Sequence, residues 1–332
     1  MATELVVREI TDVPDWDSRV WAHPGANIYC AGPWGDYKRR LGLGVRRAVI
    51  EAGGEALAFV QWQERRRGPA RLIHVQGGPV LTQAGARRAE AVFAALIGHL
   101  DLSRFDLVGV KYEQFESREA TLALLMHGFA PVVLARNHTL ELDLTQELDA
   151  IRAAMEHRWR KALRKAEGNP DLTTHFLTDR SERLAAFDDF SAMYAALQER
   201  KGFSASLRPD AYRDIAADDG RLLFLDVREK GERVLVRIAH LSAERCTDFF
   251  TASNARARAT SAAGLAVWRI VERAKAEGCR VFDFGGVDPA SNRNVFEFKR
   301  GLSGAIVQSD PLWVYSRSPA LRRAAAALLA LR

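Results

Sequence analysis

The chain has 332 residues, of which 48% are hydrophobic and 27% charged, a composition typical of a globular protein with about two domains. Its formal charge of +6 favours anionic partners such as phosphates, nucleotides, RNA or an acidic membrane face, although a general bias toward arginine would produce the same excess. The sequence shows no long apolar run, signal peptide, cysteine pair or HExxH motif, so we expect a cytoplasmic protein without a metal site.

Strand and helix patterns alternate through the first half of the chain. The predicted elements are a strand at 4–10, a short helix at 33–42, a hairpin at 46–65, a strand at 70–76, a helix at 85–100 and a strand at 105–113. Pro33 and Gly42 mark the ends of the first helix, and Gly53 and Gly54 form the hairpin turn. This order predicts a mixed sheet with covering helices.

A long helix is predicted in the middle of the chain. It follows a strand at 138–144, begins at Thr145 and ends at Gly168, which precedes Asn169 and Pro170. Because this helix separates two sets of elements, we place the domain boundary near residue 145.

The second half repeats the element order of the first. It contains a hairpin at 233–254, a helix at 261–278 closed by Gly278 and a strand at 279–286 that ends in glycine. The strand at Arg71 matches the one at Arg245, and Phe105 matches a position near Val281. This repetition predicts a duplicated α/β (α+β) domain, with the first domain at 1–145 and the second at 146–316.

The last residues, 317–332, are predicted to form a separate short helix. Ser318 is the expected N-cap and Pro319 lies in the first turn. The apolar side of this helix fits two arrangements, packing against the protein body or lying on a membrane surface. We favour packing.

The stretch FDFGGVDPASNRNVFEFKRGLSG at 282–304 carries the main candidate site. Gly285 and Gly286 would let a substrate approach the end of a strand closely, because glycine has no side chain. Asp283 would need a partner there, and a structural role as a turn cap is the competing interpretation. Phe296 and Lys299 share a helix face, which makes Lys299 either a fixed cation for an oxyanion or phosphate or an ordinary surface lysine.

A basic segment lies within the predicted long helix. Its cations recur at helical spacing, at Arg158, Arg160, Lys161, Arg164 and Lys165. Such a face fits the phosphates of a tRNA acceptor end, and it equally fits a solvated helix surface.

Several of these stretches together resemble the FemABX family. VFDFGGVDP and FEFKRGLSG resemble its signature, NIYCAGPWGDYKRRLG its early Trp and Lys segment, and HVQGGPV its glycine turn. HRWRKALRKAEG resembles its basic interdomain helix, and ERKGFSASLRPDAY a further segment, so that the matches extend over 27–304. The chain lacks the heptads of the coiled-coil arm found in some members, and Leu302 stands where an aromatic residue is commoner.

The resemblance implies two tandem GNAT-like domains, each a mixed twisted sheet with flanking helices. It also implies an enzyme that transfers an aminoacyl group from aminoacyl-tRNA to an amine of a peptidoglycan precursor, or a related amine, without a cofactor. The acceptor would be a nucleotide-sugar or lipid-linked muropeptide, contact with the inner membrane face would be peripheral, and DNA would not bind.

The resemblance also assigns site residues. Lys299 and Phe298, with Asp283, would form the acyl-transfer centre beside Gly285 and Gly286. The residues implied to bind substrate are Trp34, Lys38 and Arg208, the last two at a diphosphate. No Ser-His-Asp or Cys-His arrangement is evident, which favours direct attack by the amine, and the sequence leaves the general base open among Asp283, solvent and the substrate.

Two other functions compete with this interpretation. An acyl-CoA N-acyltransferase acting on a polysaccharide or lipid precursor would need a glycine-rich pyrophosphate loop at a helix start, and the corresponding segments RATSAAG and TQAGARRAE match that pattern poorly. A non-catalytic sugar- or RNA-binding protein could retain the fold without the chemistry.

Overall fold

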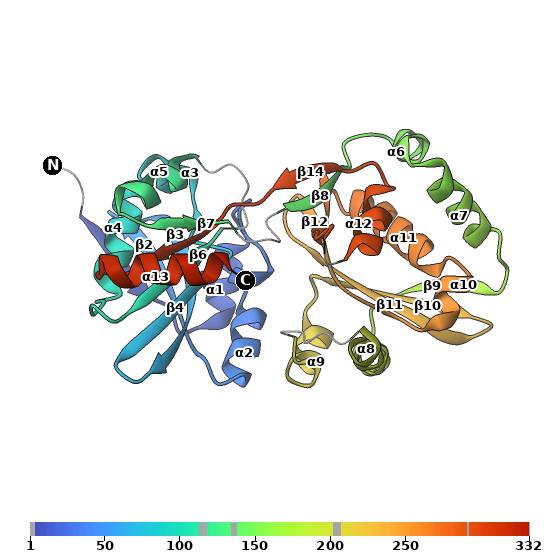
Figure 1. Ribbon diagram of the computed structural model, residues 1–332, viewed down its shortest axis with the longest axis horizontal. Coiled ribbons are helices and arrows are strands. Elements are labelled where there is room, and N and C mark those ends of the chain that lie inside the picture. Colours follow the sequence, from blue (N-terminus) through green and yellow to red (C-terminus); the bar gives the residue numbers. More distant parts are fainter. Residues whose placement is uncertain (1–3, 113–117, 134–137, 202–206, 291, 332) are drawn as a thin grey trace. The chain divides into compact units, whose positions relative to one another are not determined.

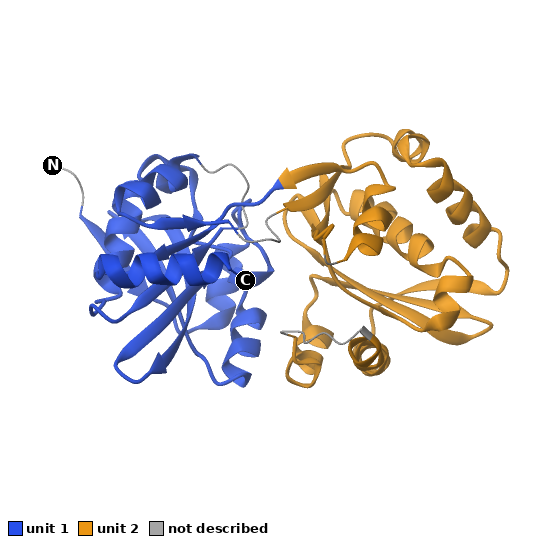
Figure 2. Cartoon of the chain, viewed as in Figure 1, with its two compact units in different colours: residues 1–137, 308–332 blue, residues 138–307 orange. Residues whose placement is uncertain are grey.

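The computed structural model describes residues 4–112, 118–133, 138–201, 207–290 and 292–331. Its contacts divide the chain into two units (Figure 2). Unit 1 comprises Met1–Asn137 and Gln308–Arg332, and unit 2 comprises His138–Val307. The end of the chain thus returns to the unit in which the chain begins, and the domain boundaries predicted at 145 and 316 stay predictions.

Unit 1 is built on a sheet with the strand order β1-β2-β3-β4-β6-β15-β7, and β5 pairs with β3 (Figure 1). The strands are β1 (Leu5–Glu9), β2 (Gly44–Ala52), β3 (Glu55–Arg67), β4 (Ala70–Gln76), β5 (Val80–Leu81), β6 (Leu107–Lys111), β7 (Ala130–Val132) and β15 (Leu312–Tyr315). β4 and β6 run parallel, and the other paired strands run antiparallel.

Helices cover both faces of this sheet. They are α1 (Val13–Val20), α2 (Gly32–Arg40), α3 (Gln83–Arg87), α4 (Ala89–His99), α5 (Arg118–Met126) and α13 (Pro319–Ala330), with a 3-10 turn, η1, at Ile28–Cys30. Trp313 of β15 packs in the main core with α4 and α5, whereas Val314 packs with Ala325 of α13. Neighbouring residues of a strand face opposite sides, so α13 covers the face away from α4 and α5.

Unit 2 has a sheet with the order β14-β8-β13-β12-β11-β10-β9. The strands are β8 (His138–Asp143), β9 (Leu172–Leu177), β10 (Leu222–Glu229), β11 (Glu232–Leu241), β12 (Arg245–Ser253), β13 (Val281–Gly286) and β14 (Ala305–Gln308). The helices are α6 (Leu148–Ala154), α7 (His157–Glu167), α8 (Arg180–Lys201), α9 (Pro209–Asp218), α10 (Ala255–Ala259), α11 (Ala262–Ala276) and α12 (Arg293–Arg300). β12 and β13 run parallel.

The two sheets have the same strand order along their main path, and β5 is additional in unit 1. Counted from β1 in unit 1 and from β9 in unit 2, the seven strands of the main path correspond in space, and the parallel pair β4–β6 corresponds to β12–β13. The predicted match between the strands at Arg71 and Arg245 is therefore confirmed, and so is the fold class of two mixed sheets with flanking helices. Among the described residues, no helix combines the length and apolar content needed to cross a bilayer.

Two predicted helices are each divided in the structure. The one predicted at 145–168 is α6 and α7, separated by the extended residues Met155 and Glu156. The break is stabilised from outside the helix, because the N–H of Glu156 donates to the carbonyl of Gly301 at 2.9 Å. Thr145 does not cap α6, since its N–H and hydroxyl both bind the Asp143 carboxylate.

The helix predicted at 85–100 begins earlier and is also interrupted. α3 starts after Thr82, whose side chain accepts a hydrogen bond from the N–H of Gly85, and a break at Arg88 separates α3 from α4. A Cβ on Gly85 would lie 1.8 Å from the Leu57 carbonyl oxygen. This glycine therefore lets α3 lie directly against β3, rather than starting the helix.

The C-terminal helix is confirmed. The Ser318 side chain accepts a hydrogen bond from the N–H of Leu321, as an N-cap does. Ala325 packs against Val132 and Val314 of the unit 1 sheet, so the favoured arrangement, packing against the body, is also confirmed.

Candidate functional site

The strand β13 holds Asp283 on one face and two phenylalanines on the other. Phe282 and Phe284 are buried in the core of unit 2, with ring centroids 4.8 Å apart. The carboxylate of Asp283 accepts hydrogen bonds from the Thr139 hydroxyl and, at 2.8 Å, from the N–H of Gly285. Its other oxygen lies 3.5 Å from the Arg245 guanidinium. Asp283 therefore links β13 to β8 and holds the turn at the strand end.

The two glycines that follow Asp283 open the end of β13. Gly285 has a φ of 69°, a conformation that favours glycine, and a Cβ there would lie 3.3 Å from the Asp248 carbonyl oxygen. The register between β13 and β8 shifts between Asp283 and Gly286. The carbonyl oxygens of both glycines are consequently available to a side chain from outside the sheet.

Lys299 of α12 donates hydrogen bonds to those carbonyls. Its ammonium nitrogen Nζ donates to the carbonyl oxygen of Gly286 at 3.0 Å and to that of Gly285 at 3.3 Å. Burial lowers the pKa of this half-buried lysine below its ordinary value, while the nearby charges of Asp248 and Asp283 oppose the shift and Arg237 adds to it. The structure thus brings Lys299, Asp283 and the glycines together.

A buried ion pair, which the sequence interpretation missed, lies among the same charges. The Arg237 side chain on β11 is 5% exposed and the Asp248 side chain on β12 is 9% exposed. The Arg237 guanidinium donates hydrogen bonds to both carboxylate oxygens of Asp248, with Nε 2.9 Å from Oδ1. A charged residue between Val236 and Ile238, within the otherwise apolar run 234–239 of the strand, was the signal that could have identified it.

Phe298 lies beside Lys299 but faces a different neighbour. Its ring centroid is 5.4 Å from that of Trp159 on α7, and its carbonyl accepts a hydrogen bond from the Trp159 indole at 2.9 Å. Phe298, the residue before Lys299, is therefore held in place by Trp159 of α7.

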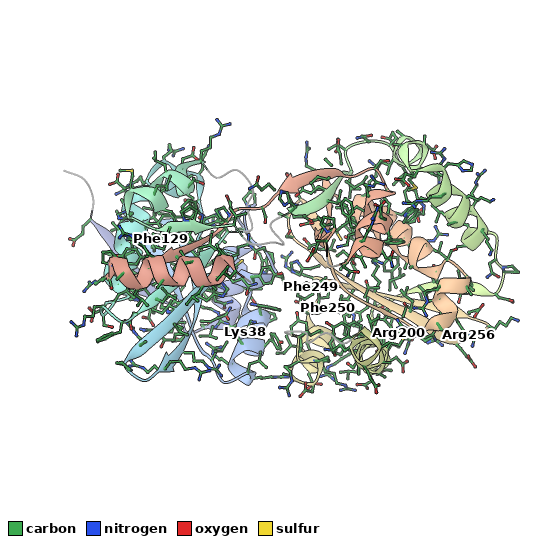
Figure 3. The ribbon with its side chains drawn as sticks, in the orientation of Figure 1. Lys38, Phe129, Arg200, Phe249, Phe250 and Arg256 are labelled. Carbon is green, nitrogen blue, oxygen red and sulfur yellow. The ribbon has the colours of Figure 1, made fainter. Side chains whose placement is uncertain are left out.

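Unit 1 contains the predicted Trp and Lys segment on α2. The Lys38 Nζ lies 4.5 Å from the centroid of the buried Trp34 ring and 5.2 Å from that of Tyr37 (Figure 3 labels Lys38). Burial lowers the pKa of Lys38. Burial, together with the charge of Lys38, lowers the pKa of His74 to about 4, so His74 is neutral at physiological pH. Lys38 is thus a partly desolvated cation beside aromatic rings.

Arg208 lies at the start of α9 in unit 2. Its side chain is 66% exposed and pairs with Asp210 at 3.4 Å. Lys38 and Arg208 belong to different units, and their joint binding of a diphosphate stays a prediction. Part of the segment ERKGFSASLRPDAY, residues 202–206, lies outside the described residues.

The basic helix α7 is amphipathic. Trp159, Leu163 and Ala166 form its buried face. Arg160 is committed to structure, because it donates to the carbonyls of Ala153 and Met155 at the end of α6.

The other cations of α7 are exposed. Arg158 pairs with Glu156 at 2.8 Å and with Glu297 at 3.5 Å. Lys161, Arg164 and Lys165 are exposed, and within the described part of the chain no acidic side chain lies within ion-pair distance of them. These three side chains form a cationic surface, which we call the α7 surface.

A pocket of about 520 Å³ lies between α7, the start of α11 and α12. Its lining includes the aromatic rings of Trp159 and Phe298, the arginines Arg158 and Arg258, and Ser261 at the N-terminus of α11. The lining also includes Glu297, which pairs with Arg158. The aromatic residues, Arg258 and the helix N–H groups are the features that suit a planar group carrying negative charge.

Comparison with known proteins agrees with this architecture. Residues 153–300 match the family model of the acetyltransferase (GNAT) domain. No curated protein matches the chain. The crystal structure of FemX is 15% identical and matches 97% of this chain and 100% of its own, with a TM-score of 0.81.

Two further solved structures match at lower TM-scores. The C-terminal domain of a putative lysylphosphatidylglycerol synthetase from Agrobacterium fabrum is 14% identical and covers 96% of both chains, with a TM-score of 0.60. A tandem GNAT protein from the clavulanic acid biosynthesis pathway is 14% identical and covers 95% of this chain and 99% of its own, with a TM-score of 0.56. The chain therefore has the tandem GNAT acyltransferase fold, and the FemABX resemblance of its motifs extends to a FemX-like structure along nearly its whole length.

Proposed function

We propose that the protein is an aminoacyltransferase that moves an aminoacyl group from aminoacyl-tRNA to an amine of a peptidoglycan precursor or a related amine acceptor. The observation that carries this proposal is the ammonium group of Lys299, held by two glycine carbonyls at the open end of β13. The same residue stands in the motif that resembles the FemABX signature, and the whole chain has a FemX-like fold.

The proposed reaction is direct aminolysis of an ester. The neutral acceptor amine attacks the ester carbonyl, a C–N bond forms, and the carbonyl oxygen becomes an oxyanion in the tetrahedral intermediate. The Lys299 ammonium stabilises that charge in a partly desolvated site. The C–O bond to the ribose oxygen then breaks, the amine nitrogen loses its proton, and the leaving oxygen gains one.

The assigned parts of this centre differ in role. Asp283 anchors the turn through its bonds to Thr139 and Gly285, so its contribution is to position the glycine carbonyls that hold Lys299. The buried pair of Arg237 and Asp248 fixes the charges that face the ammonium. Phe298, which precedes Lys299 on α12, lines the pocket.

The donor would bind to unit 2. The α7 surface provides three exposed cations for RNA phosphates, and Arg158 lies both on this helix and in the pocket. The aromatic rings of the pocket suit the base of a terminal nucleotide, because stacking on aromatic side chains accepts any base. This assignment keeps the acylated end of the donor close to Phe298.

The acceptor would bind through Trp34, Lys38 and Arg208, with the two cations at a diphosphate. A lysine packed on Trp34 and Tyr37 has restricted motion and less water around it, which strengthens its interaction with an anion. A nucleotide-sugar or lipid-linked muropeptide supplies such a diphosphate. Both proposed substrates are cytoplasmic or face the cytoplasm, so we place the reaction there, with peripheral contact to the inner membrane face for a lipid-linked acceptor.

A second candidate function is transfer from acyl-CoA to an amine. It is favoured by the match of residues 153–300 to the acetyltransferase (GNAT) domain and by the pocket at the N-terminus of α11, where N–H groups suit a pyrophosphate. Against it, Ser261 rather than glycine begins α11, in a left-handed conformation with a φ of 60°.

A radiolabel transfer assay tests the main proposal. Purified protein is incubated with tRNA charged with a labelled amino acid and with UDP-linked muropeptide, with and without prior RNase treatment. Label should reach the muropeptide only when the tRNA is intact. Equal transfer after RNase treatment would exclude the tRNA-borne donor.

Thermal unfolding separates the two donors. A ligand that binds only the folded protein raises the unfolding temperature, so a non-hydrolysable aminoacyl-tRNA analogue should stabilise the protein and acetyl-CoA should not. Strong stabilisation by acetyl-CoA alone would reverse this ranking and favour the acyl-CoA reaction.

A further inference from the structure

Trp159 lies where α7 meets the end of α12. Its side chain is 6% exposed, and its indole N–H donates to the Phe298 carbonyl at 2.9 Å. That carbonyl belongs to the last turn of α12, where carbonyl groups lack a partner further along the helix. The indole therefore caps a carbonyl in the last turn of α12, at the residue before Lys299.

The indole packs against two glycines, of which Gly301 is the one that leaves space for it. A Cβ on Gly301 would lie 2.4 Å from Trp159 Cδ1, closer than a side chain can approach. A Cβ on Gly264 of α11 would lie 3.5 Å from the other end of the ring, at Cη2. The ring is thus held between α11 and the residue that follows α12, so that its position and that of the α12 end depend on each other.

Further bonds join α7 to the same turn. The N–H of Glu156 donates to the Gly301 carbonyl at 2.9 Å, and the Ser303 hydroxyl donates to the Ala154 carbonyl at 2.5 Å. Arg158 reaches the carboxylate of Glu297 at 3.5 Å. These contacts explain why the predicted long helix is broken at Met155 and Glu156, because the break turns the first residues of α7 toward α12.

We infer that Trp159 is a positioning residue that holds Lys299 against the glycine carbonyls and connects the α7 surface to the proposed acyl-transfer centre. The inference rests on the function proposed above for Lys299. Trp159 and the exposed cations occupy opposite faces of one helix of 11 residues, so a shift of α7 on donor binding would reach Phe298 and Lys299 through the indole, alongside the bonds of Glu156 and Arg158. Trp159 contacts no reacting atom and acts through α12.

The matched variants are Trp159→Phe and Trp268→Phe. Trp159→Phe keeps an aromatic ring and removes the N–H that binds Phe298. Trp268 on α11 is a second buried tryptophan of the same core, 2% exposed, and among the described residues its indole nitrogen has no hydrogen-bond partner. Trp268→Phe therefore makes the same chemical change in the same unit without a bond to α12.

The first readout needs no substrate. The protein is pulsed with an amine-acylating reagent, and the labelling of Lys299 is measured by peptide mass spectrometry relative to the exposed Lys165. Trp159→Phe should raise the labelling of Lys299 by about fivefold, the factor that corresponds to the loss of one hydrogen bond, and Trp268→Phe should leave it unchanged. Equal labelling of Lys299 in all three proteins would overturn the inference, whether or not transfer activity is found.

The second readout is a double-mutant cycle on turnover. Trp159→Phe should lower kcat by about 5- to 100-fold, the range expected when a reacting group is misplaced, and should have little further effect in a Lys299→Ala background. Equal losses in both backgrounds would mean that Trp159 acts independently of Lys299 and would contradict the inference. If the wild-type protein transfers no label at all, the proposed function fails while the labelling result still decides the role of Trp159.

A third variant tests the inference if Trp159→Phe does not fold. Should Trp159→Phe unfold the protein, Gly301→Ala moves the same ring by adding one methyl group and leaves the tryptophan in place. It should raise Lys299 labelling in the same direction, with circular dichroism and thermal unfolding confirming a folded protein. A folded Gly301→Ala protein with wild-type labelling would contradict the inference.

Discussion

Each unit has its own sheet with the same main strand order, but the units differ in the helix that follows the parallel pair of strands. In unit 2, β13 is followed by α12, which returns Lys299 to the strand end. In unit 1, β6 is followed by α5, which carries no lysine and exposes Leu122, Leu125 and Met126. The same strand order therefore presents a desolvated cation at the strand end in one unit and an apolar helix face in the other.

The units also differ in the helices that connect their strands. Unit 2 has the extra helices α6 and α7 between its strands β8 and β9, whereas unit 1 starts with β1. The desolvated lysine of unit 1, Lys38, lies on α2 and packs on Trp34 rather than on backbone carbonyls. A duplicated scaffold thus differs mainly in the helices attached to it, which supports the proposal that unit 2 performs the chemistry and that Lys38 of unit 1 contributes to acceptor binding.

Of the substitutions that test this division of roles, Lys299→Ala should lower turnover most. Loss of one oxyanion donor typically lowers kcat by about 100- to 1000-fold, and we expect that range with the fold intact by circular dichroism. Lys275→Ala is the matched control, because Lys275 also donates to two backbone carbonyls, those of Leu144 and Gln146, at 2.9 Å. Unchanged turnover in Lys299→Ala would favour a non-catalytic binding protein.

The pH dependence of turnover should reflect the same lysine. Burial lowers the pKa of Lys299, and the reaction needs its charged form, so kcat should be full below this lowered pKa and fall about tenfold per pH unit above it. The fall should begin below the pH at which an ordinary lysine titrates. In Lys299→Arg the residual kcat should lose this alkaline limb, because the guanidinium stays charged. An identical limb in both proteins would assign it to another group.

The α7 surface should determine the salt dependence of donor binding. Replacing Lys161, Arg164 and Lys165 by alanine should reduce the slope of log affinity against log salt by about 2 to 3, close to one unit per phosphate contact. The measurement is filter binding of charged tRNA at several salt concentrations. The control removes three exposed cations from unit 1, Arg65, Arg66 and Arg67, and an equal reduction there would mean that net charge alone matters.

The smallest expected effect is on acceptor binding in unit 1. Lys38→Ala should raise the KM for the muropeptide about tenfold, as expected for the loss of one charge-assisted contact, and should change kcat little. Arg39→Ala is the control, because Arg39 is an exposed cation of the same helix that pairs with Asp36 at 2.8 Å. A large fall in kcat for Lys38→Ala would instead connect unit 1 to the chemical step.

Local signals in the sequence were sufficient for much of the fold. Gly42, Gly278 and Ser318 mark helix ends in the structure as predicted, because helix stops and caps depend on residues within one turn. The strand β13 and the helix α12 were predicted for the same reason, and so the stretch at 282–304 could be recognised as a strand end followed by a cation-bearing helix.

Features that depend on distant residues were not predictable in this way. The break between α6 and α7 depends on Gly301, which lies far along the chain from Glu156. The pairing of Arg237 with Asp248 depends on the register of β11 and β12, which shifts beside Asp248. Sequence periodicity describes one element at a time, whereas these contacts arise only when elements pack together.

The placement of β15 sets an order for folding during synthesis. This strand comes from residues 312–315, yet it lies between β6 and β7 in the first sheet. Unit 2 is continuous in sequence and can close its sheet once residue 308 has left the ribosome, but the unit that emerges first must wait for the end of the chain. A nascent or truncated chain without its last twenty residues would leave β6 and β7 with unpaired edges, and these edges would expose it to aggregation and proteolysis.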